Sequence, residues 1–157
     1  FYPKRTYSVV EQTLTNEGAT LKVTLAWSSP IEYSEENSSL VSEKPGVYEI
    51  LVKQQGNGGK RRYVGQSDDL RRRFLQHLTD EEPNECVKEY VRKFKTFFRY
   101  AQPIAKEDDR EDVEKALYDR YKHKCNSPPY GEPPTGSGRN VRIDLTEKPS
   151  DEVVPLQ

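Results

Sequence analysis

The stretch PGVYEI (45–50), together with RYVGQSDDLRRRFLQH (62–77), decides the fold of this chain. Segments 47–52 and 62–66 are short and rich in β-branched and aromatic residues, which predicts two strands. The glycine-rich segment 54–61 between them predicts a loop or a hairpin turn. A hydrophobic core requires neither the paired tyrosines nor the arginines that follow, so the stretch also predicts a site that handles phosphate.

A helix is expected directly after the second strand. Ser67 or Asp68 is a suitable N-cap, because short polar side chains accept hydrogen bonds from the free amides of the first helical turn. Leu70, Phe74 and Leu78 then recur at helical spacing and predict the buried face of this helix.

The remaining segments indicate a small α+β fold. Residues 85–94 predict a short second helix, and the aromatic-rich segment 96–105 predicts a third strand. Residues 107–124 predict the longest helix, with acids in its first turn and lysines in its last. The Pro- and Gly-rich segment 125–138 excludes regular structure, and 140–145 predict a short returning strand. We therefore expect an antiparallel sheet with helices packed against it.

The N-terminal segment predicts an additional pair of strands. Residues 7–15 and 19–27 are rich in β-branched and aromatic residues, and the turn-forming sequence NEG separates them. Residues 31–45, rich in Ser and Glu, predict a linker or a short helix. The chain thus divides into an N-terminal arm or hairpin of unknown role (1–44), a main domain (45–145) and a flexible C-terminal tail (146–157).

Composition restricts the class of protein. The 157 residues suffice for one domain, and 32% of them are charged. The formal net charge is −1, so contact with nucleic acid depends on a local basic patch. There is no apolar segment of membrane-spanning length and no signal-peptide pattern, so we expect a protein without membrane contact, located in the cytoplasm or wherever DNA is found. The chain contains no Met, so residue 1 is not expected to be the natural start.

The two cysteines, Cys86 and Cys125, are far apart in the sequence. They could form one disulfide, but for a cytosolic protein we expect them to be buried and reduced.

Arg73 and His77 form the first candidate functional pair. They are four residues apart in the predicted helix, so they share a face that differs from the buried one. An arginine can bind phosphate oxygens in bidentate fashion, and a histidine one turn away can transfer a proton near neutral pH. The neighbouring Arg71 and Arg72 point in other directions, because consecutive helical residues are about 100° apart.

Two tyrosines on the predicted strands form the second candidate group. Gly46 lies two residues before Tyr48, and Gly65 lies two residues after Tyr63, so backbone or ligand can approach both phenol groups closely. A phenol near several cations is expected to have a lowered pKa and to accept a proton from water.

Glu114 and Asn126 are the candidates in the C-terminal half. Glu114 lies beside the apolar stripe of the predicted helix 107–124, which would aim it at the sheet. One carboxylate with several waters is a usual way to hold Mg²⁺. Asn126, just past the helix end, is expected either to cap the helix or to hold the substrate or the glutamate in place.

Together and in this order, these residues resemble the GIY-YIG nuclease family. The triplet GVY (46–48) stands for GIY, and YVG (63–65) stands for YIG. LRRRFLQH (70–77) resembles that family's first-helix pattern of an arginine followed four residues later by histidine. EKALYDRYKHKCN (114–126) resembles its glutamate helix, which runs on to a terminal asparagine. The resemblance covers about residues 45–126 and implies a three-stranded antiparallel sheet flanked by helices, here with additional N-terminal strands.

The activity implied by the resemblance is that of a metal-dependent endonuclease that hydrolyses DNA phosphodiester bonds with one Mg²⁺ or Mn²⁺ ion per site. By analogy, restriction-type enzymes that cut duplex DNA at specific sites are most similar. Either tyrosine would help to deprotonate the attacking water, and His77 would assist. Arg73 would stabilise the charged transition state, and Glu114 would bind the metal. The resemblance assigns catalysis to Tyr48, Tyr63, Arg73, His77 and Glu114, with support from Gly46, Gly65 and Asn126.

Basic residues near these positions are candidates for contact with the DNA backbone, which gives salt-dependent affinity without reading sequence. A solvated surface is the alternative for each one taken singly. The candidates are Lys60, Arg61, Arg62, Arg71 and Arg72, with Lys88, Arg92 and Lys95 further along the chain.

Two other functions fit the same residues. One is a structure-directed repair or junction nuclease, and the other is a catalytically silent module that binds DNA or protein on the same fold. A cut through both strands with one active centre per chain would favour a homodimer.

Overall fold

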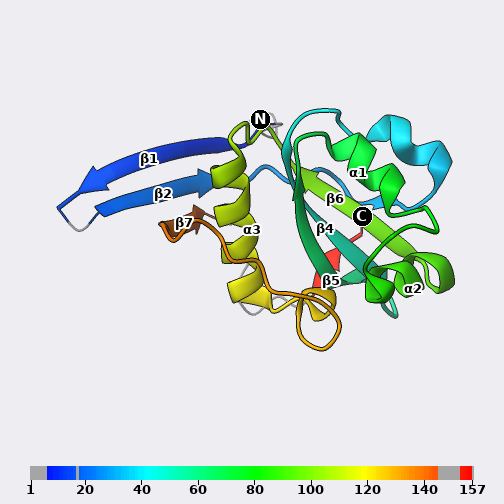
Figure 1. Ribbon diagram of the computed structural model, residues 1–157. Coiled ribbons are helices and arrows are strands. Elements are labelled where there is room, and N and C mark those ends of the chain that lie inside the picture. The colour runs from blue at the N-terminus through cyan, green and yellow to red at the C-terminus, as the bar shows by residue number, and fades with distance from the viewer. Residues whose placement is uncertain (1–6, 17, 145–152, 157) are drawn as a thin grey trace.

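Two sheets organise the chain, and the computed structural model describes residues 7–16, 18–144 and 153–156. The larger sheet has the strand order β3-β6-β4-β5-β8, and the smaller has the order β1-β2-β7 (Figure 1). The strands are β1 (Val9–Thr15), β2 (Gly18–Thr24), β3 (Ile31–Glu32), β4 (Gly46–Lys53), β5 (Gly58–Ser67), β6 (Thr96–Ala101), β7 (Asn140–Asp144) and β8 (Val153–Pro155).

Three α-helices and two 3-10 helices complete the described part of the fold. They are α1 (Leu70–Gln76), α2 (Glu85–Lys93), α3 (Glu107–Tyr121), η1 (Glu35–Leu40) and η2 (Lys124–Asn126). The predicted α+β class is therefore confirmed, and so are the predicted helices and strands of the main domain, within a few residues at their ends.

The three strands predicted for the main domain form the centre of the larger sheet. Strand β4 pairs antiparallel with both β5 and β6, which places Tyr48 opposite Gly65 on one side and Tyr100 on the other. The sheet is wider than expected, because β3 adds to the edge of β6 and β8 adds to the edge of β5.

Helices cover both faces of this sheet (Figure 1). Side chains alternate along β4, so Val47 packs against α3 while Tyr48 and Ile50 pack against the side of α1 and α2. On that second side, Phe74 and Phe98 are fully buried, and their rings meet edge to face at 5.1 Å between centroids. The first tyrosine of the motif therefore points into an aromatic core rather than towards α3.

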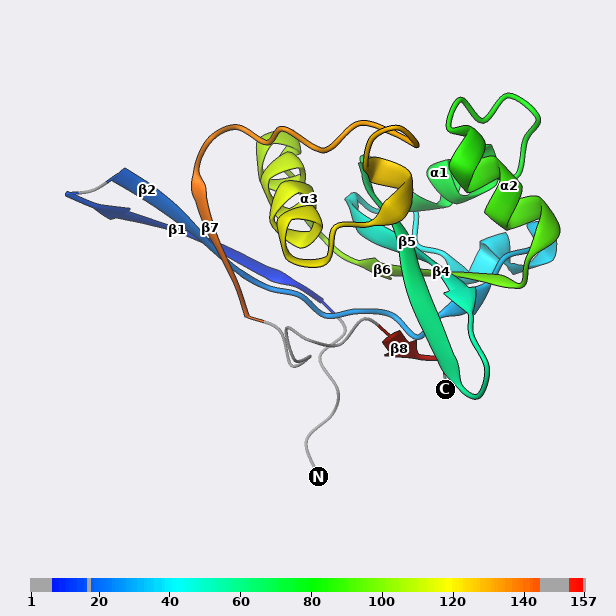
Figure 2. The same cartoon turned by 90° about the horizontal axis from the view of Figure 1, so that it is seen from below.

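The N-terminal strands form the predicted hairpin, which projects away from the larger sheet on the side of α3 (Figures 1 and 2). The predicted returning strand 140–145 is observed as β7, which pairs in parallel with β2. Leu21 and Val23 of the hairpin are buried in the same cluster as Val113 and Leu117 of α3. Burial of these side chains explains why the smaller sheet stays attached to the main domain.

Two local expectations are corrected. The N-cap of α1 is Asp69, whose side chain accepts from the Arg72 amide, and not Ser67 or Asp68. Ser67 instead accepts from the Asp69 amide and donates to the Asp69 carbonyl, which shapes the turn before the helix. In the tail, expected to be flexible, β8 pairs with β5 and Val154 is buried; residues 146–152 and 157 lie outside the described residues.

The cysteines correct a further expectation, because Cys86 and Cys125 form a disulfide. The bond links α2 to η2, which the fold brings together although 39 residues separate them. Among the described residues, no helix is both long and apolar enough to cross a membrane.

Candidate active site

Gly65 is required because the Tyr48 ring occupies the space above it. A Cβ at Gly65 would lie 2.3 Å from both Cζ and the hydroxyl oxygen of Tyr48. At Gly46 a Cβ would lie 2.2 Å from the backbone oxygen of Ala101 on β6. Both glycines of the motif therefore permit close packing inside the sheet, and at Gly65 the approaching group is the phenol itself.

Tyr48 and His77 are joined by a hydrogen bond at the end of α1. The Tyr48 hydroxyl lies 2.8 Å from Nε2 of His77, and both side chains are 1% exposed. His77 is the C-cap residue of α1, so the helix ends where its side chain meets β4. The arginine–histidine spacing noted in the sequence thus places His77 against the tyrosine.

Glu82 lies against the other ring nitrogen of His77. Its Oε2 lies 2.7 Å from Nδ1 of His77, a close contact whose alignment is poor for a hydrogen bond. Burial and the nearby charge of Arg73 hold the pKa of His77 below its usual value, although contact with Glu82 opposes them. His77 is therefore neutral near pH 7, with its proton on the nitrogen that faces the carboxylate and with Nε2 as an acceptor.

Arg73 lies between the two tyrosines and Glu82. Its Nη1 is 3.7 Å from Oε2 of Glu82, and its side chain is mostly buried. Its charge acts on both Tyr48 and Tyr63, and its Nη1 donates to Oε1 of Gln76 at 3.4 Å. The Tyr48 and Tyr63 ring centroids are 6.2 Å apart.

Glu114 completes the group from α3. Its charge acts electrostatically on Tyr48 and Tyr63, and the charge of Arg73 acts on Glu114. Burial, with a smaller contribution from Glu111, raises the pKa of Glu114 to about 7 against the opposing charge of Arg73. Within the described residues it makes no hydrogen bond or ion pair of its own, and the charge of Arg73 does not cancel the effect of burial. We call Tyr48, Tyr63, Arg73, His77, Glu82 and Glu114 the tyrosine–arginine cluster.

The expectation of acidic phenols is wrong. The pKa of Tyr48 lies well above its usual value, and that of Tyr63 is also raised, because burial disfavours the phenolate. The Arg73 charge opposes this effect at both residues without reversing it. Both tyrosines are neutral donors near pH 7, so neither is preformed as a base.

Arg61 is not available to a nucleic acid, which corrects its assignment to backbone contact. It is buried, and its Nε donates to Oε2 of Glu49 at 3.0 Å. Arg99 donates from Nε to the other oxygen of Glu49 at 2.9 Å, and Nε2 of His123 lies 2.6 Å from Oε2. We call Glu49, Arg61, Arg99 and His123 the buried charge network.

That network lies on the face of the sheet opposite Tyr48. The Arg61 guanidinium lies over the Tyr121 ring at 3.7 Å, and that of Arg99 lies over Trp27 at 4.1 Å. Burial by itself would raise the pKa of Glu49, but the charges of Arg99, His123 and Arg61 and the His123 hydrogen bond hold it far below its usual value. Loss of any one of these buried partners would be costly, so the network has a structural role.

The other basic candidates remain nearer the surface. Arg71 bonds to Glu43 and to the Val41 carbonyl, and Arg72 pairs with Asp68. Lys60 is half-buried on β5 beside β8, and Arg62 lies over the ring of Tyr90 on α2.

Asn126 acts as a support for β5 and does not cap α3. Its Oδ1 accepts from the Val64 amide and its Nδ2 donates to the Val64 carbonyl, both at 2.9 Å. The helix instead ends at Lys122 in the left-handed conformation, with φ of 50°. The amide side chain therefore replaces a neighbouring strand at this point of β5, next to Tyr63.

Glu82 is the residue of this site that the sequence did not indicate. It lies in the irregular segment between α1 and α2, where no periodicity marks an inward side chain. The nearest feature that the sequence could have indicated is Asn84, which is the N-cap of α2. Its backbone amide donates to Oε1 of Glu82.

The expectation that one Mg²⁺ or Mn²⁺ ion is bound at the site depends on Glu114 as its ligand. In the described part of the chain, no three His, Cys, Asp or Glu side chains gather into a group able to hold a metal ion. A single carboxylate fits a cation that keeps most of its water, as Mg²⁺ does. No protein-family model matches the sequence, and no curated protein matches it.

Proposed function

We propose that the protein is a metal-dependent endonuclease that hydrolyses DNA phosphodiester bonds, as the resemblance to GIY-YIG nucleases implies. The observation that carries the proposal is that five residues singled out from the sequence lie together although four separate elements supply them. Tyr48 comes from β4, Tyr63 from β5, Arg73 and His77 from α1 and its cap, and Glu114 from α3. A histidine with a lowered pKa and an acid with a raised pKa beside one arginine are typical of an active site.

Arg73 is the phosphate-binding group. Its side chain is about 24% exposed, so the guanidinium reaches the surface, while its hydrogen bond to Gln76 and its nearness to Glu82 hold its orientation. A prepositioned guanidinium stabilises the extra negative charge that develops on the phosphate oxygens during hydrolysis.

The proton leaves the attacking water through Tyr48. The Tyr48 oxygen takes a proton from water while its own proton passes to Nε2 of His77, so the phenolate never accumulates. The new water oxygen–phosphorus bond forms as the leaving oxygen departs from phosphorus. Glu82 stabilises the imidazolium that results, as the acid of a serine-hydrolase triad does. Within the described residues, the Tyr63 hydroxyl has no histidine acceptor of this kind. In this mechanism Tyr63 positions Arg73.

Glu114 is the residue that would hold Mg²⁺ or Mn²⁺. When bound there, the ion would supply positive charge to the developing phosphate dianion and the leaving oxygen. The raised pKa of Glu114 supports this role, because a desolvated carboxylate is stabilised by a nearby cation.

The test is plasmid cleavage with Mg²⁺, with and without EDTA. We expect Arg73→Ala and Glu114→Gln to lose cleavage by more than about a hundredfold. The matched controls are Arg120→Ala and Glu107→Gln, which change exposed side chains on α3. Cleavage at the wild-type rate by either cluster variant would overturn the assignment. Retention of DNA in EDTA without nicking in Mg²⁺ would indicate the binding module instead.

A further inference from the structure

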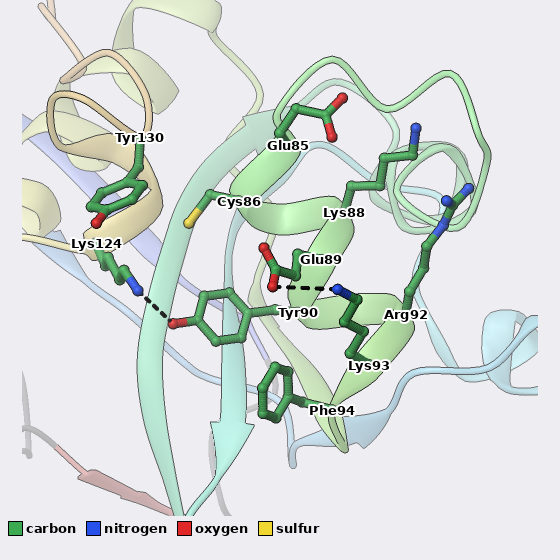
Figure 3. Close-up of a pocket in the computed structure, with 10 residues that line it drawn as sticks. All are labelled: Glu85, Cys86, Lys88, Glu89, Tyr90, Arg92, Lys93, Phe94, Lys124 and Tyr130. Carbon is green, nitrogen blue, oxygen red and sulfur yellow. Dashed lines mark hydrogen bonds and ion pairs between the residues drawn. The ribbon is translucent and has the colours of Figure 1, made fainter.

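A groove on α2 lies outside the tyrosine–arginine cluster. It has a volume of about 560 Å³ and is bounded by α2 on one side and by the segment around η2 and Tyr130 on the other (Figure 3). The disulfide between Cys86 and Cys125 joins the two walls. We call this feature the α2 groove.

Aromatic rings and a lysine form a continuous row along the α2 groove. The Phe94 and Tyr90 ring centroids are 5.5 Å apart. Lys124 donates to the Tyr90 hydroxyl at 3.0 Å, and its ammonium lies 4.9 Å from the Tyr130 ring centroid (Figure 3). Phe94 and Tyr130 are 51% and 52% exposed, so the two outer rings are accessible to a ligand.

The charge of the α2 groove favours an anionic ligand. Four cations line it against two acids, Glu85 and Glu89. One of the cations, Lys93, lies 3.6 Å from Glu89, and Lys88 donates to the Asp80 carbonyl. Arg92 also pairs with Asp80, so Lys88 and Lys124 against Glu85 give the groove its remaining positive excess, although the whole chain carries a formal charge of −1.

The α2 groove adjoins the tyrosine–arginine cluster through β5. The pairing of β4 with β5 shifts between Ile50 and Leu51, which leaves Arg62 as an extra residue in a bulge. The Arg62 guanidinium lies 5.4 Å from the Tyr90 ring centroid, while the next residue, Tyr63, belongs to the cluster. A strand whose phosphate lies at Arg73 could therefore extend into the α2 groove.

We propose that the α2 groove binds unpaired nucleotides of the nucleic acid next to the scissile phosphate. Open aromatic faces beside cations suit single-stranded nucleic acid, because its bases can stack on the rings while its phosphates meet the lysines. Bases inside a duplex are already stacked on one another and cannot use these rings. The proposal rests on the proposed nuclease function and gives it a substrate class: DNA with a flap, bulge or single-stranded end.

Binding is tested separately from cleavage, in EDTA, with the 157-residue chain and a fluorescein-labelled 20-nucleotide oligo(dT) followed by fluorescence anisotropy. We expect Phe94→Ala and Tyr130→Ala each to weaken oligo(dT) binding roughly tenfold, as loss of one stacked base does. Lys88→Ala and Lys124→Ala should lower the salt dependence of binding. A 20-bp blunt duplex should bind more weakly than oligo(dT) and change less than about threefold with the ring variants.

The matched controls lie on the N-terminal hairpin, away from α2 (Figure 1). Leu14→Ala removes an exposed apolar side chain, and Lys22→Ala removes an exposed cation. Wild-type binding of oligo(dT) by both ring variants, or equal losses in ring and control variants, would overturn the proposal. Equal or tighter binding of the blunt duplex by the wild type would also overturn it.

Cleavage provides the second arm. With Mg²⁺, wild-type protein should cut a duplex carrying a 5′ or 3′ single-stranded flap faster than a blunt duplex of the same sequence, and Phe94→Ala with Tyr130→Ala should remove that preference. If oligo(dT) binding depends on the rings but no DNA is cut, the proposal that the α2 groove binds unpaired nucleotides is supported and the nuclease proposal fails. If DNA is cut but the rings are irrelevant to flaps, the nuclease stands and the α2 groove proposal fails.

Discussion

The hydroxyl of Tyr48 lies 2.8 Å from Nε2 of His77, in a position where neither side chain is more than 1% exposed. Since Nδ1 of His77 faces Glu82, the imidazole is an acceptor towards the phenol. The two tyrosines of the motif therefore differ in their hydrogen bonds: among the described residues, Tyr48 is the one of the two that is bonded to a histidine.

Replacing each tyrosine by phenylalanine should separate their roles. We expect Tyr48→Phe to reduce the single-turnover cleavage rate by roughly 10²- to 10⁴-fold, because the proton path is lost. Tyr63→Phe should cost less than about tenfold, since Arg73 keeps its contact with Glu82. Thermal melts of both variants provide the folding control. A larger loss for Tyr63→Phe than for Tyr48→Phe would contradict the proton path.

Glu114 predicts an unusual dependence of stability on pH. Its pKa is raised to about 7 in the folded protein, so between its unfolded value and about 7 the folded state binds the extra proton. The free energy of unfolding should therefore fall as pH rises through this window. Glu114→Gln should remove a loss on the order of 1–3 kcal/mol between pH 5 and pH 8.

Urea denaturation at the two pH values measures this effect, with Glu107→Gln as the exposed control on the same helix. Addition of Mg²⁺ at pH 8 should stabilise the wild type more than Glu114→Gln, because a cation bound to the folded state raises its stability. Identical pH profiles for the wild type and Glu114→Gln would show that the carboxylate is not desolvated.

The close packing of Gly65 under Tyr48 predicts a coupled pair of mutations. Gly65→Ala should destabilise the protein by about 1–3 kcal/mol, because the new Cβ would overlap the phenol. In a Tyr48→Ala background the same change should cost much less, since the ring is gone. A double-mutant cycle by chemical denaturation measures this coupling, and additive costs would place the strain elsewhere.

The buried charge network predicts that Arg61 contributes to stability and not to DNA binding. Arg61→Ala should cost about 3–5 kcal/mol, because Glu49 would lose one of its buried partners. Arg71→Ala, which breaks a half-exposed pair with Glu43, should cost less than about 1 kcal/mol. Urea denaturation gives both values. A melting temperature unchanged by Arg61→Ala, together with weaker DNA binding, would restore its role as a DNA contact.

The disulfide predicts a fourth stability effect. Replacing Cys86 and Cys125 together by alanine should cost roughly 2–4 kcal/mol, because the bond restricts a long loop in the unfolded chain. The comparison is made by denaturant unfolding of the variant and of the oxidised protein. Titration of two free thiols in the untreated, unfolded protein would show instead that the bond is absent.

Local patterns in the sequence predicted most of the strands of the main sheet and its helices. Two short apolar segments around a glycine-rich turn gave β4 and β5, and the stripe of Leu70 and Phe74 gave the buried face of α1. These patterns are local because side-chain alternation and helical spacing depend on near neighbours. Strand β8 was missed because such a short segment forms a strand only when another strand offers a free edge.

The sequence by itself determined which residues could carry chemistry: two tyrosines flanked by glycines, an arginine four residues before a histidine, and a glutamate on the longest helix. Only the tertiary structure decided their state. The fold desolvates both phenols and so raises their pKa values, and it places Glu82 beside His77. It also pairs Arg61 with Glu49 and joins Cys86 to Cys125 in a disulfide. The physical reason is that residue type is local, whereas desolvation, charge pairing and bond formation depend on which distant segments the fold brings within a few ångströms.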